Sequence, residues 1–196
     1  SGCTDPYAEN YNENAEYEDG SCTYPDNGDY TLSFDGIDDL VELNQSAISS
    51  SQNTFSAMFN AAESEHYDFD SGKPIYTQGA SSSSYANYAI GLHSDGLYIE
   101  LDGPSNNGVH KITGPIDFDT WYHLTVVFDT GQISTYLNYN LESVIEVPFS
   151  IIIPNNSGGY LGNRWGVENQ NNGGYKWNGS IDQVSFWNLA LFDIGI

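Results

Sequence analysis

The sequence is poor in basic residues. Its 196 residues include four Lys and Arg against 27 Asp and Glu, and the formal net charge at pH 7 is −23. Nucleic acids and anionic membranes are bound through clustered Lys and Arg, so this composition argues against both partners. Such acidity keeps a protein soluble in salty water and suits calcium, which fits a marine or otherwise saline extracellular setting.

Cysteine is scarce as well. Cys3 and Cys22 are the only two, and they bracket a short polar segment that has almost no core of its own. Such a segment cannot stay folded by burial, so we expect a disulfide, which is worth about 3 kcal/mol for a loop of this length. The disulfide implies an oxidising, extracytoplasmic compartment. Two free thiols are the alternative.

Long apolar runs are also missing, and no stretch approaches the length of a membrane span. We therefore expect no insertion into a membrane. The chain opens at Ser1-Gly2 without a secretory signal, as expected of a mature or trimmed end.

Aromatic residues are plentiful, with 15 Tyr, nine Phe and four Trp, and they favour strands. Short stretches alternate between apolar and polar residues, and 20 Gly and seven Pro separate them as turns. No stretch longer than about seven residues has a convincing helical period. The pattern predicts an all-β fold whose clearest segments are Asn53–Phe59, Lys73–Thr77, the hairpin Ala86–Leu101 turned at Ser94-Asp95-Gly96, and Asp117–Asp129 with its partner Gln132–Leu141.

One strand near the end of the chain breaks the period of two. Val184 and Phe186 share a face, but Ile181 falls on the opposite one. An extra residue at Asp182-Gln183, a β-bulge, restores the parity and turns the Asp182 carboxylate sideways. We expect a cation as partner of that carboxylate. The alternative is that Asp182 caps a local turn.

Three motifs carry a family resemblance. They are Phe-Asp-Gly-Ile-Asp-Asp-Leu-Val-Glu-Leu at 34–43, Trp-Tyr-His-Leu-Thr-Val-Val-Phe at 121–128 and Gly-Ser-Ile-Asp-Gln-Val-Ser-Phe-Trp-Asn at 179–188. Together they resemble the laminin-G-like, concanavalin-A-like jelly roll. The resemblance implies a two-sheet antiparallel sandwich over residues 29–196, with its first and last strands side by side in one sheet. Where the family turns through Asn-Gly, this chain has Asn138-Tyr139-Asn140, which indicates a longer turn or a surface contact.

Residues 1–24 form a predicted N-terminal cap, and residues 25–28 a linker. The cap resembles the thrombospondin type 3-like repeats of secreted bacterial proteins, which implies calcium binding. Hard oxygen ligands are available there, from Asp5, Asn10, Asn12, Asn14 and Asp19. A solvated acidic turn locked by the disulfide is the alternative. We expect a second, structural calcium at Asp35, Asp38 and Asp182.

Catalysis finds little support. Glucanases of the same architecture carry two Glu and an Asp on one strand face, and Glu100-Leu-Asp102 is the nearest match. Gly103-Pro104 follows, so the strand ends before a second Glu. We predict that Glu100 and Asp102 are strand-edge charges and that the protein is not an enzyme. His123 is predicted to be a packed, hydrogen-bonded residue rather than a ligand.

Carbohydrate binding is the favoured function. Sugars stack on aromatic faces and bond to planar polar side chains, and the segment 162–177 is rich in both. Trp177 is expected to pack in the core. The candidate contacts are Trp165, Arg164, Tyr175, Asn163, Lys73, His66, Tyr85 and Tyr88.

Bases in predicted loops favour a sulfated or uronate polymer, with scattered salt-bridge partners as the alternative. These bases are Lys73, Arg164 and Lys176. The sequence thus predicts a secreted or cell-surface, calcium-stabilised, noncatalytic module that binds polysaccharide within a larger multidomain protein. A protein–protein adhesion or spacer module is the competing prediction.

Overall fold

The structure is a computed structural model. It describes residues 1–6, 8–17, 19–23, 31–43, 47, 52–63, 72–79, 87–102, 108–147, 158–163 and 176–191. The chain divides into two compact units, Ser1–Thr31 and Leu32–Ile196. The first unit contains the residues predicted as cap and linker, and the second contains every strand.

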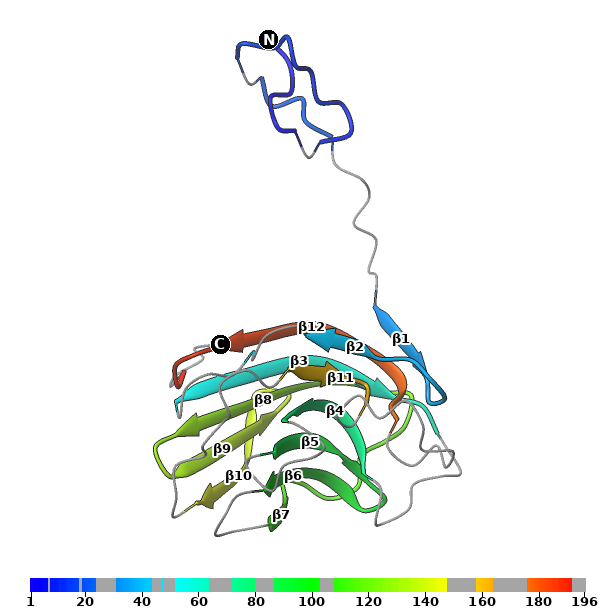
Figure 1. The fold of residues 1–196 in the computed structure, drawn as a ribbon, viewed down its shortest axis with the longest axis vertical. Helices are drawn as coiled ribbons and strands as arrows, with labels where there is room; N and C mark the ends of the chain where they lie inside the picture. The colour runs from blue at the N-terminus through cyan, green and yellow to red at the C-terminus, as the bar shows by residue number, and fades with distance from the viewer. Residues whose placement is uncertain are drawn as a thin grey trace. The chain divides into compact units, whose positions relative to one another are not determined.

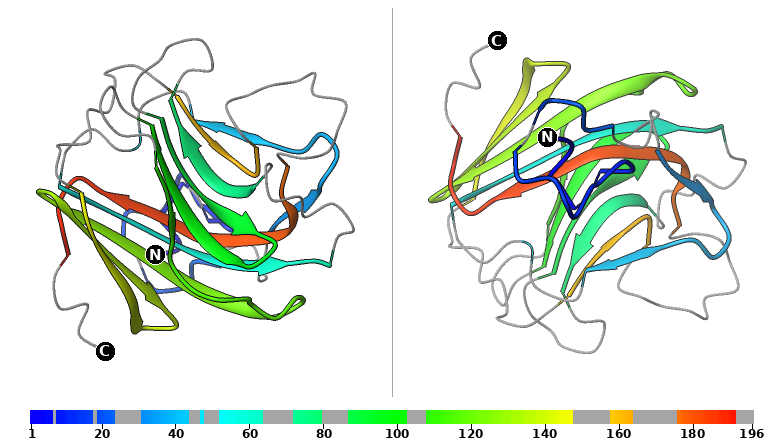
Figure 2. Two further views of the ribbon diagram at one scale, coloured as in Figure 1. Left: turned by 90° about the horizontal axis from the view of Figure 1, so that it is seen from below. Right: turned by 90° about the horizontal axis from the view of Figure 1, so that it is seen from above.

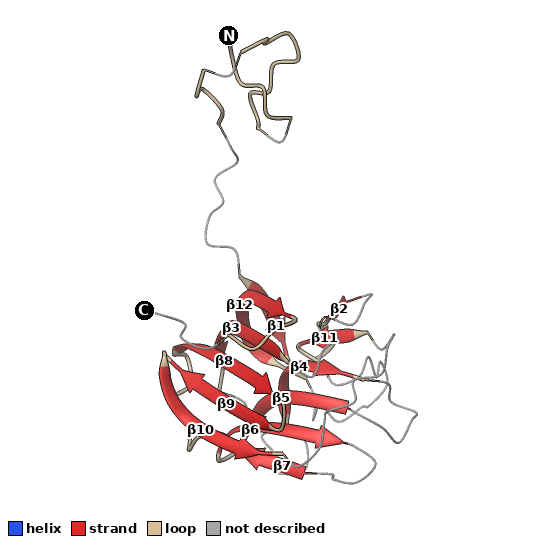
Figure 3. Cartoon of the chain, turned by 90° about the vertical axis from the view of Figure 1, so that its left-hand side faces the viewer, coloured by secondary structure: helices blue, strands red, loops and turns tan. Residues whose placement is uncertain are grey.

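Twelve strands and no helix make up the described part of the second unit (Figure 3). No described helix is therefore long and apolar enough to cross a membrane. The strands are β1 (Leu32–Asp35), β2 (Val41–Leu43), β3 (Asn53–Ala61), β4 (Lys73–Gln78), β5 (Asn87–His93), β6 (Gly96–Asp102), β7 (Gly108–Lys111), β8 (Trp121–Asp129), β9 (Gln132–Leu137), β10 (Asn140–Glu146), β11 (Gly159–Leu161) and β12 (Asn178–Trp187).

The strands form two antiparallel sheets of six. The first sheet has the order β1-β12-β3-β8-β9-β10 and the second β2-β11-β4-β5-β6-β7. Figure 1 and both views of Figure 2 show the sheets as two layers. β1 and β12 are neighbours, with Leu32 opposite Ile181. The predicted sandwich, and the pairing of its first and last strands, are confirmed.

Strand alternation produces the core between the sheets. Phe55, Ala57 and Phe59 of β3 are fully buried, as are Leu124 and Val126 on the neighbouring β8. Side chains of opposite parity on these strands point to the outer face of the first sheet. The core is largely aromatic: the rings of Phe55 and Tyr76 stack across the layers, and Trp177 meets Phe59 edge-on. Trp177 is fully buried, as predicted.

The predicted bulge is present in β12. Asp182 lies opposite Met58 and Ser185 opposite Ser56, so β12 has one residue more than β3 between the two pairs. Gln183 takes the irregular position with φ +48°. Ile181 is consequently buried on the same face on which Val184 and Phe186 pack against the core.

The cap is closed by a disulfide between Cys3 and Cys22, as predicted. Polar side chains organise the rest of its backbone. The Asn10 amide donates to the Ser21 carbonyl oxygen over 2.6 Å and accepts from the Thr23 N–H over 2.8 Å, so it ties two distant parts of the loop together.

Candidate functional site

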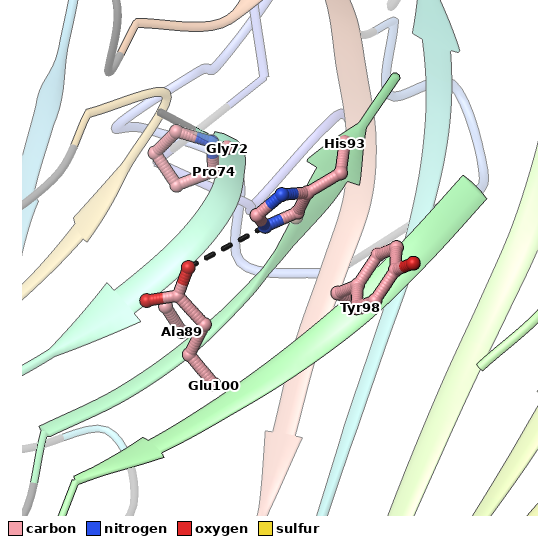
Figure 4. A pocket seen from close by; sticks show the side chains of 7 residues that line it. Gly72, Pro74, Ala89, His93, Tyr98 and Glu100 are labelled. Atoms are coloured by element: carbon pink, nitrogen blue, oxygen red, sulfur yellow. Dashed lines mark ion pairs between the residues drawn. The ribbon is translucent and has the colours of Figure 1, made fainter. Parts of the chain in front are cut away.

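A depression lies on the outer face of the second sheet (Figure 4). It opens to solvent, involves β4, β5 and β6, and is shallow, with a volume of about 10 Å³ open to a water-sized sphere. Its walls combine one carboxylate, one imidazole, one phenol ring and small residues that leave room above the sheet. The lining residues are Gly72, Pro74, Ala89, Gly91, His93, Tyr98 and Glu100.

Strand register brings the polar side chains of the depression together. Glu100 lies opposite Ala89, and Tyr98 lies opposite Gly91, so the large side chains of β6 stand beside small residues of β5. The His93 ring leans across this space, and its Nε2 lies 3.4 Å from Oε1 of Glu100. Figure 4 shows the Glu100 carboxylate directed toward the imidazole.

Gly72 fixes where His93 can lie. A Cβ at position 72 would come within 2.5 Å of His93 Nε2, so only glycine permits the ring to cover the backbone at this point. The His93 and Tyr98 rings are 4.6 Å apart between centroids. His93 and Glu100 are only 8% and 17% exposed, so a ligand could reach no more than a small edge of either side chain.

A charged pair supports the Tyr98 ring from outside. The Tyr98 hydroxyl donates to both carboxylate oxygens of Asp95 over 2.8 and 2.9 Å. Asp95 in turn pairs with Lys111, whose Nζ lies 2.9 Å from Asp95 Oδ2. Hydrogen bonds from Lys111 and then Tyr98 lower the pKa of Asp95, and burial followed by the Asp95 hydrogen bond raises the pKa of Tyr98. The phenol therefore stays protonated and oriented.

Three predicted sugar contacts are buried. Tyr88 is 2% exposed and packs edge-on against Tyr76 and Phe128 in the core, so its ring cannot stack on a polysaccharide. Lys73 begins β4, in line with the predicted strand Lys73–Thr77, and is 2% exposed, and burial lowers its pKa. Asn163 is 1% exposed. Alternation turns Tyr88 of β5 inward, whereas every residue of β4, Lys73 included, is buried.

The other five predicted contacts lie outside the described residues. These are Trp165, Arg164, Tyr175, His66 and Tyr85. The segment 164–175 is joined to the fold at Asn163 and Lys176, which form an isolated β-bridge. Gly72, the first described residue after the segment that contains His66, lies beside His93 in the depression.

Lys176 lies outside the strands, as predicted, but it is buried, at 8% exposure, so little of its ammonium group is available to a ligand. With Lys111 paired to Asp95, the described lysines place no exposed, uncommitted ammonium group at the depression.

The predicted calcium set at the start of the sandwich needs one correction. Carboxylate oxygens of Asp35, Asp38 and Asp39 lie within 4.8 Å of one another, and Asp182 is not among them. Register explains why: Asp35 pairs with Asn178, which is about 13 Å along β12 from Asp182. Asp182 instead accepts the Gln183 N–H over 2.7 Å, which matches the alternative of a local cap.

The Asp35, Asp38 and Asp39 cluster retains free ligand capacity. Asp35 Oδ1 accepts the Ile37 and Asp38 N–H groups, and Asp39 Oδ2 accepts the Asp35 N–H. The remaining oxygens are exposed hard donors of the type that calcium prefers. In the cap, Asn12 and Asp19 use side-chain oxygens to accept the N–H groups of Asn14 and Ser21, and calcium binding there stays a prediction.

Sequence reasoning missed the depression. It treated Glu100 as a strand-edge charge, whereas Glu100 lies inside β6 and lines the depression with Tyr98 and His93. The alternation of Tyr98 and Glu100 was available as a signal that the two share a face. Their approach to His93 depends on the register of β5 with β6. His123 is hydrogen-bonded to Ser56 Oγ over 2.9 Å, as predicted for a packed residue.

Two six-stranded antiparallel sheets, closed by adjacent first and last strands, define a lectin-like jelly roll. The chain belongs to the Concanavalin A-like lectin/glucanases superfamily, a laminin-G-like family whose profile matches residues 35–193. A comparison with curated protein sequences finds no match.

Solved structures share this fold. Domain 4 of an extracellular GH43 arabinanase from Geobacillus stearothermophilus, in complex with arabinotriose, has a TM-score of 0.63 and 18% identity over 90% of this chain and 80% of that one. The CBM40 of Ruminococcus gnavus IT-sialidase has a TM-score of 0.66 and 13% identity, over 83% of this chain and 92% of the CBM40 chain. A heptameric SAP-like pentraxin from Limulus polyphemus has a TM-score of 0.60 and 19% identity, over 83% of this chain and 77% of the pentraxin chain.

Proposed function

We propose that this chain is a noncatalytic polysaccharide-binding module that holds a sugar in the depression of the second sheet. One observation carries the proposal: Tyr98, His93 and Glu100 converge above a floor of small residues. An aromatic edge beside planar polar groups is the combination by which proteins hold sugars. The arabinanase domain with arabinotriose and the CBM40 with sialyllactose are relatives in fold that bind sugars.

The charges favour a neutral glycan. Among the described residues, Glu100 is the one carboxylate that lines the depression, and no Lys or Arg lines it. A sulfate or uronate there would meet a like charge instead of a cation. Hydroxyl groups of a neutral sugar can instead donate to Glu100 and exchange hydrogen bonds with His93. Among the described bases none favours an anionic polymer, and recognition of one would depend on Arg164.

The lining also favours binding over hydrolysis. Glycosidases place two carboxyl groups roughly 5 to 10 Å apart on either side of the scissile bond. Among the described residues that line the depression, Glu100 alone carries a carboxylate. The disulfide fits an extracytoplasmic protein, secreted or on the cell surface. Trp165 and Tyr175, together with His66 and Tyr85, remain our candidates for further contacts outside the described residues.

The test is affinity gel electrophoresis against mixed-linkage β-glucan, arabinoxylan, linear arabinan, galactomannan, carrageenan and fucoidan. We expect retardation by a neutral polymer, weakened at least about tenfold in Glu100→Gln, which preserves shape but removes a charged acceptor. Trp165→Ala tests the segment 164–175 in parallel, and Tyr17→Ala, an exposed residue of the cap, serves as control.

Retardation only by carrageenan or fucoidan would reject a neutral ligand and direct attention to Arg164. No retardation by any polymer would reject carbohydrate binding for this panel, and the protein–protein adhesion module would then be tested by crosslinking.

We also propose that calcium stabilises the sandwich through Asp35, Asp38 and Asp39. Three carboxylates within 4.8 Å repel one another unless a cation neutralises them. Saturating calcium should raise the thermal midpoint by roughly 5 to 10 °C, measured by calorimetry against EDTA. Asp38→Asn should abolish the rise, whereas Asp182→Asn, the same chemical change outside the cluster, should keep it. An equal loss in both variants would contradict this assignment.

A further inference from the structure

An exposed aromatic platform lies on the outer face of the first sheet, on the other side of the sandwich from the depression. We define it as Trp121, His123 and Tyr139. Trp121 and His123 alternate with the buried Leu124 and Val126 along β8, so they share the outer face. Trp121 is 40% exposed and Tyr139 is 54% exposed. The rings of His123 and Tyr139 stack, with centroids 4.6 Å apart and planes 28° from parallel.

The Tyr139 ring is held there at a conformational cost. Asn138 and Tyr139 form a two-residue turn between β9 and β10 with φ values of +48° and +67°. This is the left-handed region, which glycine tolerates and tyrosine does not favour. The departure from Asn-Gly therefore does not lengthen the turn. An exposed aromatic kept in a strained position indicates selection for a contact.

The strained turn is also rigid. The Asn138 side-chain oxygen accepts the His123 N–H over 2.9 Å, and the Asn138 N–H donates to the His123 carbonyl over 2.8 Å. Asn140 Nδ2 donates to the Asn138 carbonyl oxygen over 3.0 Å. Since His123 is itself bonded to Ser56, the His123 ring and the turn that carries Tyr139 are held in place before any ligand arrives. Preorganisation of this kind lowers the entropic cost of binding.

The other end of the same face is covered. Thr54 Oγ1 donates to the Leu189 carbonyl oxygen and accepts the Leu191 N–H, each over 3.0 Å, so the chain after β12 lies over that end. Thr54 pairs with Val127, whereas Trp121 pairs with Asn60. The platform is therefore the uncovered end of this face, with the Asn60 amide opposite Trp121 in register.

The size of the platform favours a sugar over a protein. With about 200 Å² for each aromatic side chain, the exposed fractions of Trp121 and Tyr139 leave roughly 200 Å² accessible. A stable protein interface needs about 800 Å² per partner. Leu141 and Val144 on β10, each about half exposed, cannot supply the difference.

We infer that Trp121, His123 and Tyr139 form a second glycan-binding site, which stacks a neutral sugar ring on the opposite side of the sandwich from the depression. The choice of a glycan rests on the function proposed above. Two sites that face away from each other cannot hold one sugar, so the module would contact two chains or two segments of a folded polymer.

The test is a nuclear magnetic resonance titration of the whole chain with xylotetraose, cellotetraose, mannotetraose and arabinotriose. We expect one of these to shift the backbone amides of His123, Asn138 and Tyr139. Trp121→Ala should weaken this response about tenfold or more, because stacking on the indole is lost.

Tyr139→Gly separates binding from folding. It removes the ring but gives the turn its favoured residue, so the thermal midpoint should rise by about 2 to 4 °C while the sugar response falls about tenfold or more. Tyr17→Gly in the cap, which removes a tyrosine that is 73% exposed, should leave the response unchanged.

Shifts confined to the amides of residues 89–100 would overturn the second site and leave the depression as the binding site. No shift anywhere, together with no gel retardation, would reject both proposals. A different outcome is that the wild type self-associates in sedimentation experiments, with Tyr139→Gly abolishing the association and no sugar shifting the amides of the platform. That result would show a protein interface and overturn the glycan site.

Discussion

Among the described residues of the unit Ser1–Thr31 the buried apolar ones are Cys3 and Ala8, whereas the unit Leu32–Ile196 buries a continuous cluster around Phe59 and Trp177. Apolar burial stabilises the second unit in proportion to the area removed from water. The first unit buries too little for this, and it depends on the Cys3–Cys22 disulfide and on side-chain hydrogen bonds to its backbone. A covalent link therefore replaces a core where the chain is too short to build one.

The largest effect should come from Phe59→Ala. Phe59 is fully buried and contacts Tyr122 and Trp177, so its removal leaves a cavity and should cost about 3 to 5 kcal/mol of unfolding free energy. Chemical denaturation followed by tryptophan fluorescence measures the loss. The dispersion of the cap's amide resonances should not change. If the cap lost that dispersion in the variant, the two units would be shown to fold together.

Reduction should act on the other unit. Opening Cys3–Cys22 removes about 3 kcal/mol from the cap, which exceeds what its small buried surface can replace. Amide spectra with and without a phosphine reductant should show collapse of the cap resonances and an unchanged thermal midpoint for the sandwich. A lower midpoint of the sandwich after reduction would contradict the independence of the units.

Local strain in the sandwich gives a smaller effect. Gln183 has φ +48° in the β12 bulge and is exposed. A β-branched residue fits this conformation poorly, so Gln183→Val should cost about 1 to 2 kcal/mol, whereas Gln183→Gly should be neutral or slightly stabilising. If Gln183→Val and Gln183→Gly unfold at the same urea concentration, the bulge does not constrain this position.

The smallest effect is expected from pH. Burial lowers the pKa of His123, so the folded sandwich prefers the neutral imidazole. Its contribution is complete above the unfolded pKa of about 6.5 and is lost as pH falls from that value through the lower pKa of the folded state. Hydrogen bonds from Ser21 lower the pKa of Asp19 in the cap, so the contribution of Asp19 is lost only below about pH 4.

Thermal midpoints between pH 8 and 5 check the His123 contribution. His123→Gln should show a shallower decline than the wild type over this range, since the titrating group is gone. If the thermal midpoints of the wild type and His123→Gln fall equally steeply with pH, His123 is not the cause of the decline.

Much of the fold could be predicted from local patterns. The bulge followed from the parity of Ile181, Val184 and Phe186, because a strand has two faces and one must be apolar. The disulfide followed from the shortness and polarity of the segment between Cys3 and Cys22, which cannot build a core of its own. The predicted calcium cluster was partly wrong, since membership depends on which residues of β1 and β12 face each other, and Asp39 takes the place expected for Asp182.

The sequence by itself determined the all-β sandwich, the disulfide-closed cap, the acidic character and the family, because alternation, composition and short motifs act within a few residues. The tertiary structure decided which face of a sheet each polar residue occupies. Tyr88 and Lys73 lie inside the sandwich, whereas Glu100, His93 and Tyr98 meet on an outer face. That outcome depends on strand register and on the packing of one sheet against the other, which join residues distant in the chain and leave little local trace.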